Sequence, residues 1–401
     1  MKTQTQPPVV LLGGLNIVRA LGMAKIPVII ASSERRTPSM ASRYCAGTLA
    51  LPPLGETASS REAYVETLVR AGLRLAAQHG APVPLFYDND DRLALVQDYR
   101  AALSPHFALL LNEPALGAAL LDKSLFQTLA ERRRLPVPRR IEWSALDAEN
   151  GPVLVKPKVR TAWDHSIVLR RLFGGVGKAR VFGSGRKAGA DALVRQLAGQ
   201  LAFQECVPGG DDAIWSFHGF AAPDGELLEW FIGRKIRTFP AHTGDSSYLR
   251  LARDDGLAAL GRDIAACLPL AGIFKMDFKR SSATGRFYLL EINTRFNLWH
   301  YLGAKNGVNL PRVAYEFLTR NRRPERSNAQ TRYRWLCLRY DWRAYRELRA
   351  RRELNAAGWL WSLAQAPKVY DLFSWSDPLP FLRSWQHRLR AKLRRLRLAA
   401  A

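Results

Sequence analysis

The 401 residues exceed one ordinary domain, and hydrophobic residues make up 47% of them. This composition provides enough apolar surface for two or three packed cores, and it excludes a chain that is disordered throughout. Lysine and arginine outnumber aspartate and glutamate by 60 to 35, which gives a net charge of +25, so nucleotides, nucleic acid and anionic membranes are the partners that the charge favours.

Residues 8 to 110 alternate short apolar runs with helical patterns. We expect helices from Leu15, across Tyr64 to Ala77 and from Asp91. The expected strands are 8–12, 27–31, 48–52, 82–87 and 107–111. This βα alternation is typical of a parallel sheet with helices on its faces, so it predicts an α/β, Rossmann-like first domain over residues 1 to 111.

Gly13 and Gly14 end the first of these strands, where dinucleotide-binding proteins carry a GxGxxG loop. The sequence GGLNIV lacks that spacing. We therefore interpret the two glycines as a tight turn between strand and helix, without a bound cofactor.

The pattern changes at Asn112. Two helical stretches lead to the basic segment 131–140, after which strand patterns dominate, and further helices are expected at 188–198 and near 257–268. The expected strands are 151–157, 178–182, 201–207, 212–222, 226–239, 272–280 and 286–295. This mixture predicts an α+β domain over residues 112 to 320.

The last two of these strands carry the strongest chemical signal. The connector between them, SSATG, is short and turn-forming, so it predicts an antiparallel hairpin that places Asp277 beside the second strand. Glu291, Asn293 and Arg295 are alternate residues and leave the same face of that strand. Two carboxylates and an amide oxygen suit Mg²⁺ that is held together with substrate phosphates. The alternative is a set of solvated charges with Arg295 as their ion-pair partner.

Three lysines at strand or helix edges are candidates for binding phosphate. Lys123 opens a helix, Lys156 ends the apolar strand PVLVKP, and Lys235 lies in the strand FIGRKIRTF. Phosphoryl transfer is catalysed mainly by positioning and by neutralising oxygen charge, which lysines supply. For each one, a solvated surface lysine is the alternative.

The segment GGVGKA is similar to a P-loop at first sight. A Walker A sequence needs glycine where Leu172 stands and Ser or Thr where Ala179 stands, so we reject that interpretation. We expect a flexible, glycine-rich hairpin lid from about Lys158 to Lys178, because glycine permits close backbone approach to phosphates. A plain surface loop is the alternative.

The segment FQECVPGGDD joins an apolar strand to a Pro-Gly-Gly turn. Backbone groups of Cys206 and Val207 are placed to pair with an adenine edge, and an acid a few residues later is placed to bind ribose hydroxyls. By itself this segment fits an ordinary strand exit equally well.

In this order the motifs resemble the ATP-grasp superfamily: Asp-Lys on a helix, a strand ending in Lys-Pro, a glycine-rich lid, a strand followed by QExxPG, a later lysine, and then MDF and ExNxR. The resemblance covers about residues 9 to 320. GGLNIVRALG, PVII, SRYC and GRKIRTFP are similar to predicted carboxylate-amine ligases related to biotin carboxylase and D-aspartate ligase. The resemblance implies a Rossmann-like pre-ATP-grasp domain, a two-lobed ATP-grasp domain, and ATP and Mg²⁺ as cofactors.

The resemblance also implies roles for individual residues. Lys123 and Lys156 would contact the ATP phosphates, Glu205 and Val207 would hold adenine, and Asp212 would hold ribose. The implied ligands of two Mg²⁺ ions are Asp277, Glu291 and Asn293. The residues implied to lie near the acid substrate, its acyl phosphate or the phosphates are Arg295, Lys235 and Arg237.

The implied reaction is an ATP-dependent ligation: a carboxylate becomes an acyl phosphate, an amine then replaces the phosphate, and ADP and phosphate are released. Two features depart from the pattern. The lid contains WDH and the apolar IVLRRLF, and the residue before Val207 is a cysteine. No motif names the acid or the amine, and a homo-oligomer is left open.

Residues 321 to 401 form a basic extension with 19 Lys and Arg against 6 Asp and Glu, and six of the 11 tryptophans. Helical runs predict a mainly helical segment, and Leu382, Trp385, Leu389, Leu393 and Leu396 recur at helical spacing among arginines. The stripe suits packing on the catalytic domain, an anionic membrane surface or nucleic acid. A non-catalytic binding protein on a degenerate ATP-grasp fold is therefore the alternative function.

The four cysteines lie far apart with no CxxC pair, which predicts reduced, buried thiols and no zinc site. The first residues contain an apolar run too short for a secretory signal, and no run of about 18 apolar residues occurs. We therefore expect a cytoplasmic protein, with peripheral attachment to the inner membrane face as a further hypothesis.

Overall fold

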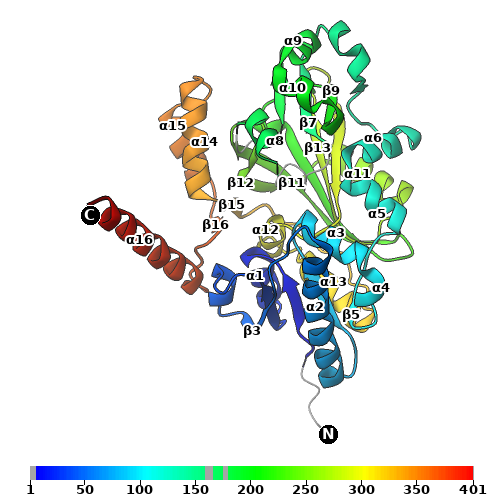
Figure 1. The fold of residues 1–401 in the computed structure, drawn as a ribbon, viewed down its shortest axis with the longest axis vertical. Helices are drawn as coiled ribbons and strands as arrows, with labels where there is room; N and C mark the ends of the chain where they lie inside the picture. The colour runs from blue at the N-terminus through cyan, green and yellow to red at the C-terminus, as the bar shows by residue number, and fades with distance from the viewer. Residues whose placement is uncertain (1–5, 159–165, 175–178, 401) are drawn as a thin grey trace. The chain divides into compact units, whose positions relative to one another are not determined.

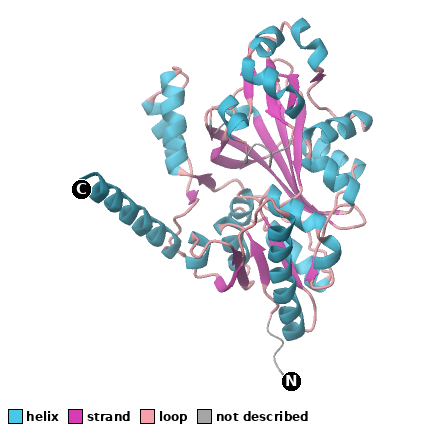
Figure 2. Cartoon of the chain, viewed as in Figure 1, coloured by secondary structure: helices cyan, strands magenta, loops and turns pink. Residues whose placement is uncertain are grey.

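The computed structural model describes residues 6–158, 166–174 and 179–400, with two compact units in the chain (Figures 1 and 2). The first unit comprises residues 1–110, 296–325 and 369–401, and the second comprises 111–295 and 326–368. The packing thus divides the chain in two, and both units contain part of the basic extension. The division into three domains at residues 111 and 320 remains a prediction.

A five-stranded parallel sheet forms the centre of the first unit. Its strand order is β3-β2-β1-β4-β5, the 3-2-1-4-5 arrangement of Rossmann-like domains. The strands are β1 (Val9–Leu12), β2 (Val28–Ser32), β3 (Cys45–Ala50), β4 (Val83–Tyr87) and β5 (Phe107–Ala108). The predicted Rossmann-like fold is confirmed, although the last strand ends three residues earlier than predicted.

Helices cover this sheet, and two of them come from far along the sequence. Helices α12 and α13 pack against α1, although nearly 280 residues separate them from it in the chain. The helices of the unit are α1 (Leu15–Met23), η1 (Pro38–Ala41), α2 (Ala58–His79), α3 (Asp90–Asp98), α4 (Arg100–Leu103), α12 (Trp299–Lys305), α13 (Leu310–Arg320) and α16 (Leu379–Ala400).

The glycine turn after β1 is closed by a carboxylate of the protein. The Gly14 N–H donates to Asp88 Oδ2 at 2.6 Å, and Arg92 pairs with the other oxygen of Asp88 at 2.9 Å. A Cβ at Gly13 would lie 3.0 Å from the Asp88 carboxyl group. The glycines therefore let a carboxylate approach the turn, which supports their interpretation as a strand-to-helix turn.

The second unit contains two antiparallel sheets. The larger sheet has the order β14-β13-β10-β11-β12-β15-β16, and all of these strands except β16 lie wholly in the second unit. Its strands are β10 (Ile214–Ala221), β11 (Leu227–Phe239), β12 (Asp245–Ala252), β13 (Gly272–Arg280), β14 (Phe287–Asn293), β15 (Arg334–Leu336) and β16 (Lys368–Tyr370). Strands β12, β15 and β16 were not predicted from the sequence.

One face of this sheet packs against the helices of the unit. Trp215, Phe217, Met276 and Phe278 alternate along β10 and β13 and lie in one core with residues of α11. The helices beside the sheet are α5 (Pro114–Leu121), α6 (Lys123–Arg132) and α11 (Asp255–Cys267). Because side chains alternate across a strand, the residues between these core positions project from the opposite face.

The smaller sheet has the order β6-β9-β7-β8, with strands β6 (Arg140–Ile141), β7 (Val153–Pro157), β8 (Arg180–Phe182) and β9 (Leu201–Glu205). The helix predicted at 188–198 is instead two short helices, α9 (Gly185–Ala190) and α10 (Ala192–Leu197). The Asp191 carboxylate accepts hydrogen bonds from the N–H groups of Leu193 and Val194, so it starts a new helix where one continuous helix was expected.

The centre of the predicted lid is helical. Residues Ile167–Leu172 form α8, and Leu169, Leu172 and Phe173 are buried in the core of the smaller sheet. The prediction of a glycine-rich hairpin is therefore wrong for this stretch, because apolar residues at helical spacing bury one side of a helix. Residues 159–165 and 175–178, which include most of GGVGK, lie outside the described residues.

The basic extension is mainly helical, as predicted. Helices α14 (Leu338–Ala350) and α15 (Ala356–Ala364) are separated at Arg352, whose φ of 61° ends the first helix. All four cysteines are free, as expected for reduced thiols. Only Cys337 is buried, whereas the other three are half-buried, so the predicted burial is wrong for these three.

Candidate active site

The hairpin predicted from the short connector is confirmed. Strands β13 and β14 pair antiparallel, with Asp277 directly opposite Glu291 and Lys275 opposite Asn293. Residues that face each other across an antiparallel pair project from the same side of the sheet. The carboxylates and the amide therefore meet on the face that points away from the core.

A network of hydrogen bonds joins these side chains. Asn293 Nδ2 lies 3.1 Å from Glu291 Oε1 and 3.4 Å from Asp277 Oδ2, and Asn293 Oδ1 accepts from Arg295 Nη2 at 3.3 Å. Asp277 also accepts from Ser216 Oγ at 2.8 Å and pairs with Lys275 Nζ at 2.5 Å. The four residues predicted to act together do lie together, with Asp277 buried.

Three members of this face were not predicted from the sequence. Ser216 lies opposite Asp277 across β10 and β13, and Lys275 and Lys279 are the second residues before and after Asp277. The alternation in FKMDFK places Lys275, Asp277 and Lys279 on one face. The period of two along the strand was therefore the signal that could have found the two lysines.

Lys156 brings the smaller sheet into the same site. Its side chain is buried at the end of β7, and burial lowers the pKa of Lys156 from 10.5 to about 7. The neighbouring ammonium of Lys123 lowers the pKa further, whereas Glu291 raises it. Charged side chains from α6, β7 and β14 therefore lie close enough to change one another's pKa, which is expected if they belong to one site between the two sheets.

Lys123 is positioned by the start of α6. The Asp122 carboxylate accepts from the N–H groups of Ser124 and Leu125 at 2.7 and 2.9 Å. The Lys123 N–H donates to the Lys158 carbonyl at 2.9 Å. The helix cap and this bond fix the backbone of Lys123 beside the end of β7.

We expect Asp122→Ala to lower the free energy of unfolding by about 1 kcal/mol, because it removes the N-cap. It should also weaken nucleotide binding a few-fold, because it frees the backbone of Lys123. Thr57→Ala is the matched control, since Thr57 caps α2 by accepting from the Ser60 N–H. Denaturant unfolding and calorimetry check this; equal nucleotide affinity in both variants would contradict the role given to Asp122.

The segment predicted to hold adenine leaves β9 with part of its backbone already bonded. The Cys206 N–H donates to the Pro152 carbonyl at 3.0 Å, so this amide is used by the protein. The Val207 N–H has no hydrogen-bond partner among the described residues. The Glu205 carboxylate accepts from the Arg139 N–H at 3.0 Å. Of the two residues predicted to present backbone groups to adenine, Val207 is therefore the one whose amide is not bonded within the described part of the chain.

Lys279 lies close to this segment. Its Cε is 3.7 Å from the Cβ position of Gly209. Burial lowers the pKa of Lys279, and Cys206 and Asp211 act in the opposite direction. The face of β13 that carries Asp277 therefore presents a lysine to the segment that follows β9.

The two aspartates after the Pro-Gly-Gly turn differ in their surroundings. Asp211 is buried and accepts hydrogen bonds from the N–H and hydroxyl of Thr238 and from the His242 N–H. Asp212 is exposed and pairs with Arg234 at 2.8 Å. Asp212 is thus the aspartate accessible to a ligand, and Asp211 ties the turn to the end of β11.

The two cations predicted on β11 have different environments. Arg237 is buried and forms a two-point ion pair with Asp341 of α14, at 2.8 and 2.9 Å. Ser247 and Trp359 also donate to Asp341. Lys235 is half-buried, and its alternation with Gly233, the partner of Ser216, places it on the face that carries Asp277.

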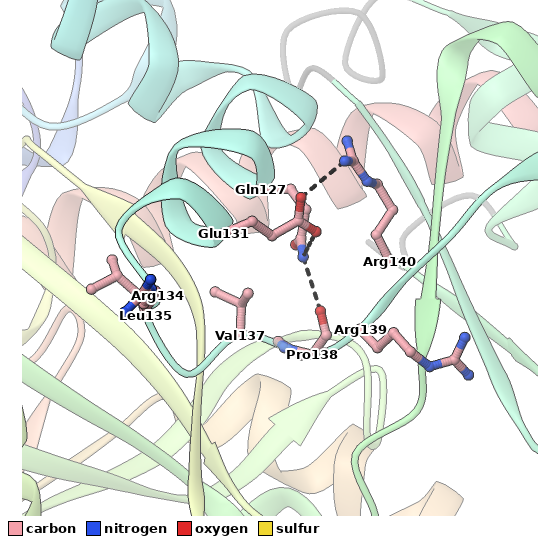
Figure 3. Close-up of a pocket in the computed structure, with 8 residues that line it drawn as sticks. All are labelled: Gln127, Glu131, Arg134, Leu135, Val137, Pro138, Arg139 and Arg140. Carbon is pink, nitrogen blue, oxygen red and sulfur yellow. Dashed lines mark hydrogen bonds and ion pairs between the residues drawn. The ribbon is translucent and has the colours of Figure 1, made fainter.

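A pocket beside the smaller sheet is separate from this cluster (Figure 3). It has a volume of about 550 Å³ and is lined by Gln127, Glu131, Arg134, Leu135, Val137, Pro138, Arg139 and Arg140. In Figure 3, the Gln127 amide bonds to the Pro138 carbonyl and Arg140 pairs with Glu131. None of the predicted site residues lines this pocket.

The donor set around Glu291 fits a small, hard cation that also binds other oxygens. Among the residues that the structure describes, no three His, Cys, Asp or Glu side chains form a group able to hold a metal ion. Two carboxylates do lie within 3.4 Å of one amide. Mg²⁺ commonly uses one or two carboxylates and takes its remaining ligands from phosphates and water. Ligation through Asn293 Oδ1 requires a half-turn of its amide, which now directs Nδ2 at the carboxylates.

Comparison with solved structures shows what this architecture is similar to. Biotin carboxylase from Campylobacter jejuni has a TM-score of 0.58 at 11% identity, covering 83% of this chain and 75% of that one. The biotin carboxylase domain of Hydrogenobacter thermophilus 2-oxoglutarate carboxylase, solved with MgADP and bicarbonate, has a TM-score of 0.58 at 13% identity, covering 82% and 73%. L-amino acid ligase from Bacillus licheniformis has a TM-score of 0.54 at 12% identity, covering 78% and 73%.

These likenesses establish the fold. The chain has the ATP-grasp architecture that its motifs predicted, with a Rossmann-like domain and a two-lobed second part. No protein-family model and no curated protein sequence matches the chain. At identities of 11 to 13%, these likenesses show the fold and not the activity.

Proposed function

We propose that this protein is a magnesium- and ATP-dependent ligase that activates a carboxylate as an acyl phosphate and joins it to an amine. The observation that carries the proposal is the convergence of Asp277, Glu291 and Asn293 on one sheet face, with the Lys156 ammonium close enough to Glu291 for the carboxylate to raise its pKa. Binding of MgATP requires both kinds of group: carboxylates that bind the metal ion, and lysines that bind the phosphates.

Asp277, Glu291 and Asn293 would hold Mg²⁺ together with the oxygens of the nucleotide. The ion supplies positive charge at the transferring phosphoryl group. Lys156 and Lys123 would contact the phosphates from the smaller sheet and α6. The Lys156 ammonium is buried, so its charge is weakly screened and acts strongly on a phosphate oxygen.

The remaining site residues keep the roles that the resemblance implies, with differences that their contacts suggest. The carbonyl of Glu205 and the N–H of Val207 would pair with adenine, and Asp212 would bind ribose. Arg295 would face the carboxylate or its acyl phosphate, with Lys235 near the phosphates. Arg237 is bound by Asp341, so we assign it to positioning β11 and not to direct contact with the acid.

The proposed reaction has two steps. The substrate carboxylate attacks the γ-phosphorus in line, the bond to the β,γ-bridging oxygen breaks, and ADP leaves. The amine then attacks the acyl carbon and loses a proton. The bond between the acyl carbon and the bridging oxygen breaks, and phosphate leaves with that oxygen. The lysines and Arg295 stabilise the negative charge on the oxygens in both steps.

A screen for ADP release tests this function. The protein is incubated with MgATP and pairs of one small carboxylate and one amine, amino acids included. We expect ADP only with particular pairs, together with a condensed product seen by mass spectrometry. Release of AMP, or turnover that is the same with and without acids and amines, would contradict the proposal.

The pKa of Lys156 predicts how nucleotide binding depends on pH. In the free protein burial lowers this pKa to about 7, and bound phosphates raise it, because they stabilise the ammonium. Below about pH 7 the lysine is already charged, so affinity should change little. Above that pH, binding must take up a proton, and the affinity should fall by up to about tenfold per pH unit.

Calorimetry in two buffers with different ionisation enthalpies measures how many protons the protein takes up when it binds nucleotide. At about pH 8 we expect nearly one proton to be taken up per nucleotide bound by the wild type. The Lys156→Met variant should take up almost none. Equal proton uptake in the two proteins would show that another group titrates on binding.

The acid, the amine and a cytoplasmic location remain proposals. So does a homo-oligomer; the dimer belongs to the Hydrogenobacter domain. The alternative, a non-catalytic protein that binds a membrane or nucleic acid, is supported by the basic extension, whereas retention of Lys156, Glu291 and Asn293 favours the enzyme. Attachment to an anionic membrane does not exclude activity, and the surface that would mediate it is in α16.

A further inference from the structure

Helix α16 is anchored at its start and exposed beyond it. Pro380 is buried, the helix packs against η1 in the same unit, and the ring of Phe381 lies 5.5 Å from that of Phe373. From Phe381 to Leu389, the last residue whose exposure is described, every side chain except Ser384 is exposed. A single helix without packing is only marginally stable in water, so this helix has a surface that is suited to a partner.

The exposed side chains form an apolar stripe between cations. Leu382, Trp385 and Leu389 follow one another at helical spacing, and Trp385 is 56% exposed. In the sequence, Leu393 and Leu396 continue the spacing. Residues 378 to 401 contain seven Lys and Arg and no Asp or Glu. The apolar stripe is thus flanked by positive charge alone.

An aromatic cluster lies at the start of the helix. Trp375 is 90% exposed, and its ring lies 4.8 Å from that of Phe373 in an edge-on contact. Phe373 in turn contacts Phe381. Tryptophan is enriched where membrane lipid meets water, because its ring is apolar and its N–H is polar. Through Phe373, the cluster connects this exposed tryptophan to the start of α16.

We propose that α16 and Trp375 form a surface that binds an anionic lipid bilayer, with the apolar stripe in the headgroup region and the arginines at the lipid phosphates. No helix in the described part of the chain has the length and apolar character needed to cross a membrane. An amphipathic helix with a basic border lies in the plane of the bilayer surface. The inference does not depend on the proposed ligase activity.

The side chains favour lipid over the two other possible partners. Nucleic acid attracts arginine and stacks on aromatic rings, but it offers no apolar surface that would bury Leu382 and Leu389. A second copy of α16 would bring two sets of seven positive charges together, and like charges at short range repel. A bilayer that contains anionic lipid satisfies both the apolar stripe and the charges.

Vesicle co-sedimentation of the full chain tests the proposal. The wild type is compared on phosphatidylcholine vesicles and on vesicles that also contain phosphatidylglycerol. We expect binding only to the anionic vesicles, with release at high salt. Replacing Leu382, Trp385 and Leu389 together by Gln should abolish binding. The pair Arg383→Gln and Arg388→Gln should weaken it about 25-fold, or about fivefold for each charge.

The matched control replaces exposed apolar residues elsewhere, Leu125→Gln with Trp143→Gln, and should bind as the wild type does. Circular dichroism shows that each variant is folded. The proposal fails if anionic vesicles do not bind the wild type at low salt, or if the triple variant binds equally well. It also fails if the α16 variants change only retention on RNA or self-association in solution.

Discussion

Glu291→Gln should lower the rate of ADP formation by about 10²- to 10³-fold and leave the melting temperature within a degree or two of the wild type. The replacement removes the charge that would bind Mg²⁺. It retains an oxygen at the position where Asn293 Nδ2 now donates at 3.1 Å. The hydrogen-bond network therefore survives, so a loss of rate reports on charge and not on folding.

Two comparisons strengthen this test. Glu142→Gln changes an exposed glutamate in the same unit and should have the rate of the wild type. The Mg²⁺ concentration for half-maximal rate should rise in Glu291→Gln, because a metal ligand is lost. ADP formation at the wild-type rate in folded Glu291→Gln protein would rule out a metal site at this position.

The second large effect is expected from Lys156→Met, which should weaken ATP binding about 10- to 100-fold at pH 7. A hydrogen bond to a charged group contributes about 1.5–3 kcal/mol, and this one would join a buried ammonium to phosphate. Methionine fills the space of the buried stem and brings no charge. The melting temperature should therefore stay the same or rise, since the cost of burying an ammonium is removed.

Lys187→Met is the control for this variant, since Lys187 is exposed on α9 of the same lobe. Isothermal titration calorimetry with a non-hydrolysable ATP analogue gives both affinities directly. If Lys156→Met and Lys187→Met bind the analogue equally well, the phosphates do not lie at the end of β7.

The residues predicted most accurately were those that local geometry fixes. The short connector predicts the β13–β14 hairpin, and strand alternation places Glu291 and Asn293 on one face of β14. The register also depends on a β-bulge between Asp277 and Phe278, which brings Glu291 opposite Asp277 and which the connector does not reveal. Local patterns also predict the alternating first unit, where apolar strands and helical patterns follow in order. The period of two in β13 also indicates Lys275 and Lys279, which lie two residues before and after Asp277 and were not predicted as site residues.

Contacts between distant segments could not be predicted in this way. Arg237 looked like a substrate-binding cation, because nothing in FIGRKIRTF shows that Asp341, 104 residues later, accepts hydrogen bonds from two nitrogens of its guanidinium. The glycines around the apolar run in the lid led to the prediction of a hairpin, although the spacing of the apolar residues favours the helix α8. The backbone bond from Cys206 to Pro152 depends on strand pairing, which a single segment does not reveal.

Formation of an acyl phosphate can be followed through the transfer of an oxygen atom. The carboxylate substrate identified by ADP release is labelled with ¹⁸O, and the phosphate released with MgATP and the amine is analysed by mass spectrometry. An acyl phosphate transfers one carboxylate oxygen to phosphorus, so the account predicts phosphate that carries one ¹⁸O. Unlabelled phosphate would show hydrolysis of ATP without activation of the acid, and ¹⁸O in AMP would show an acyl adenylate; either result would contradict the account.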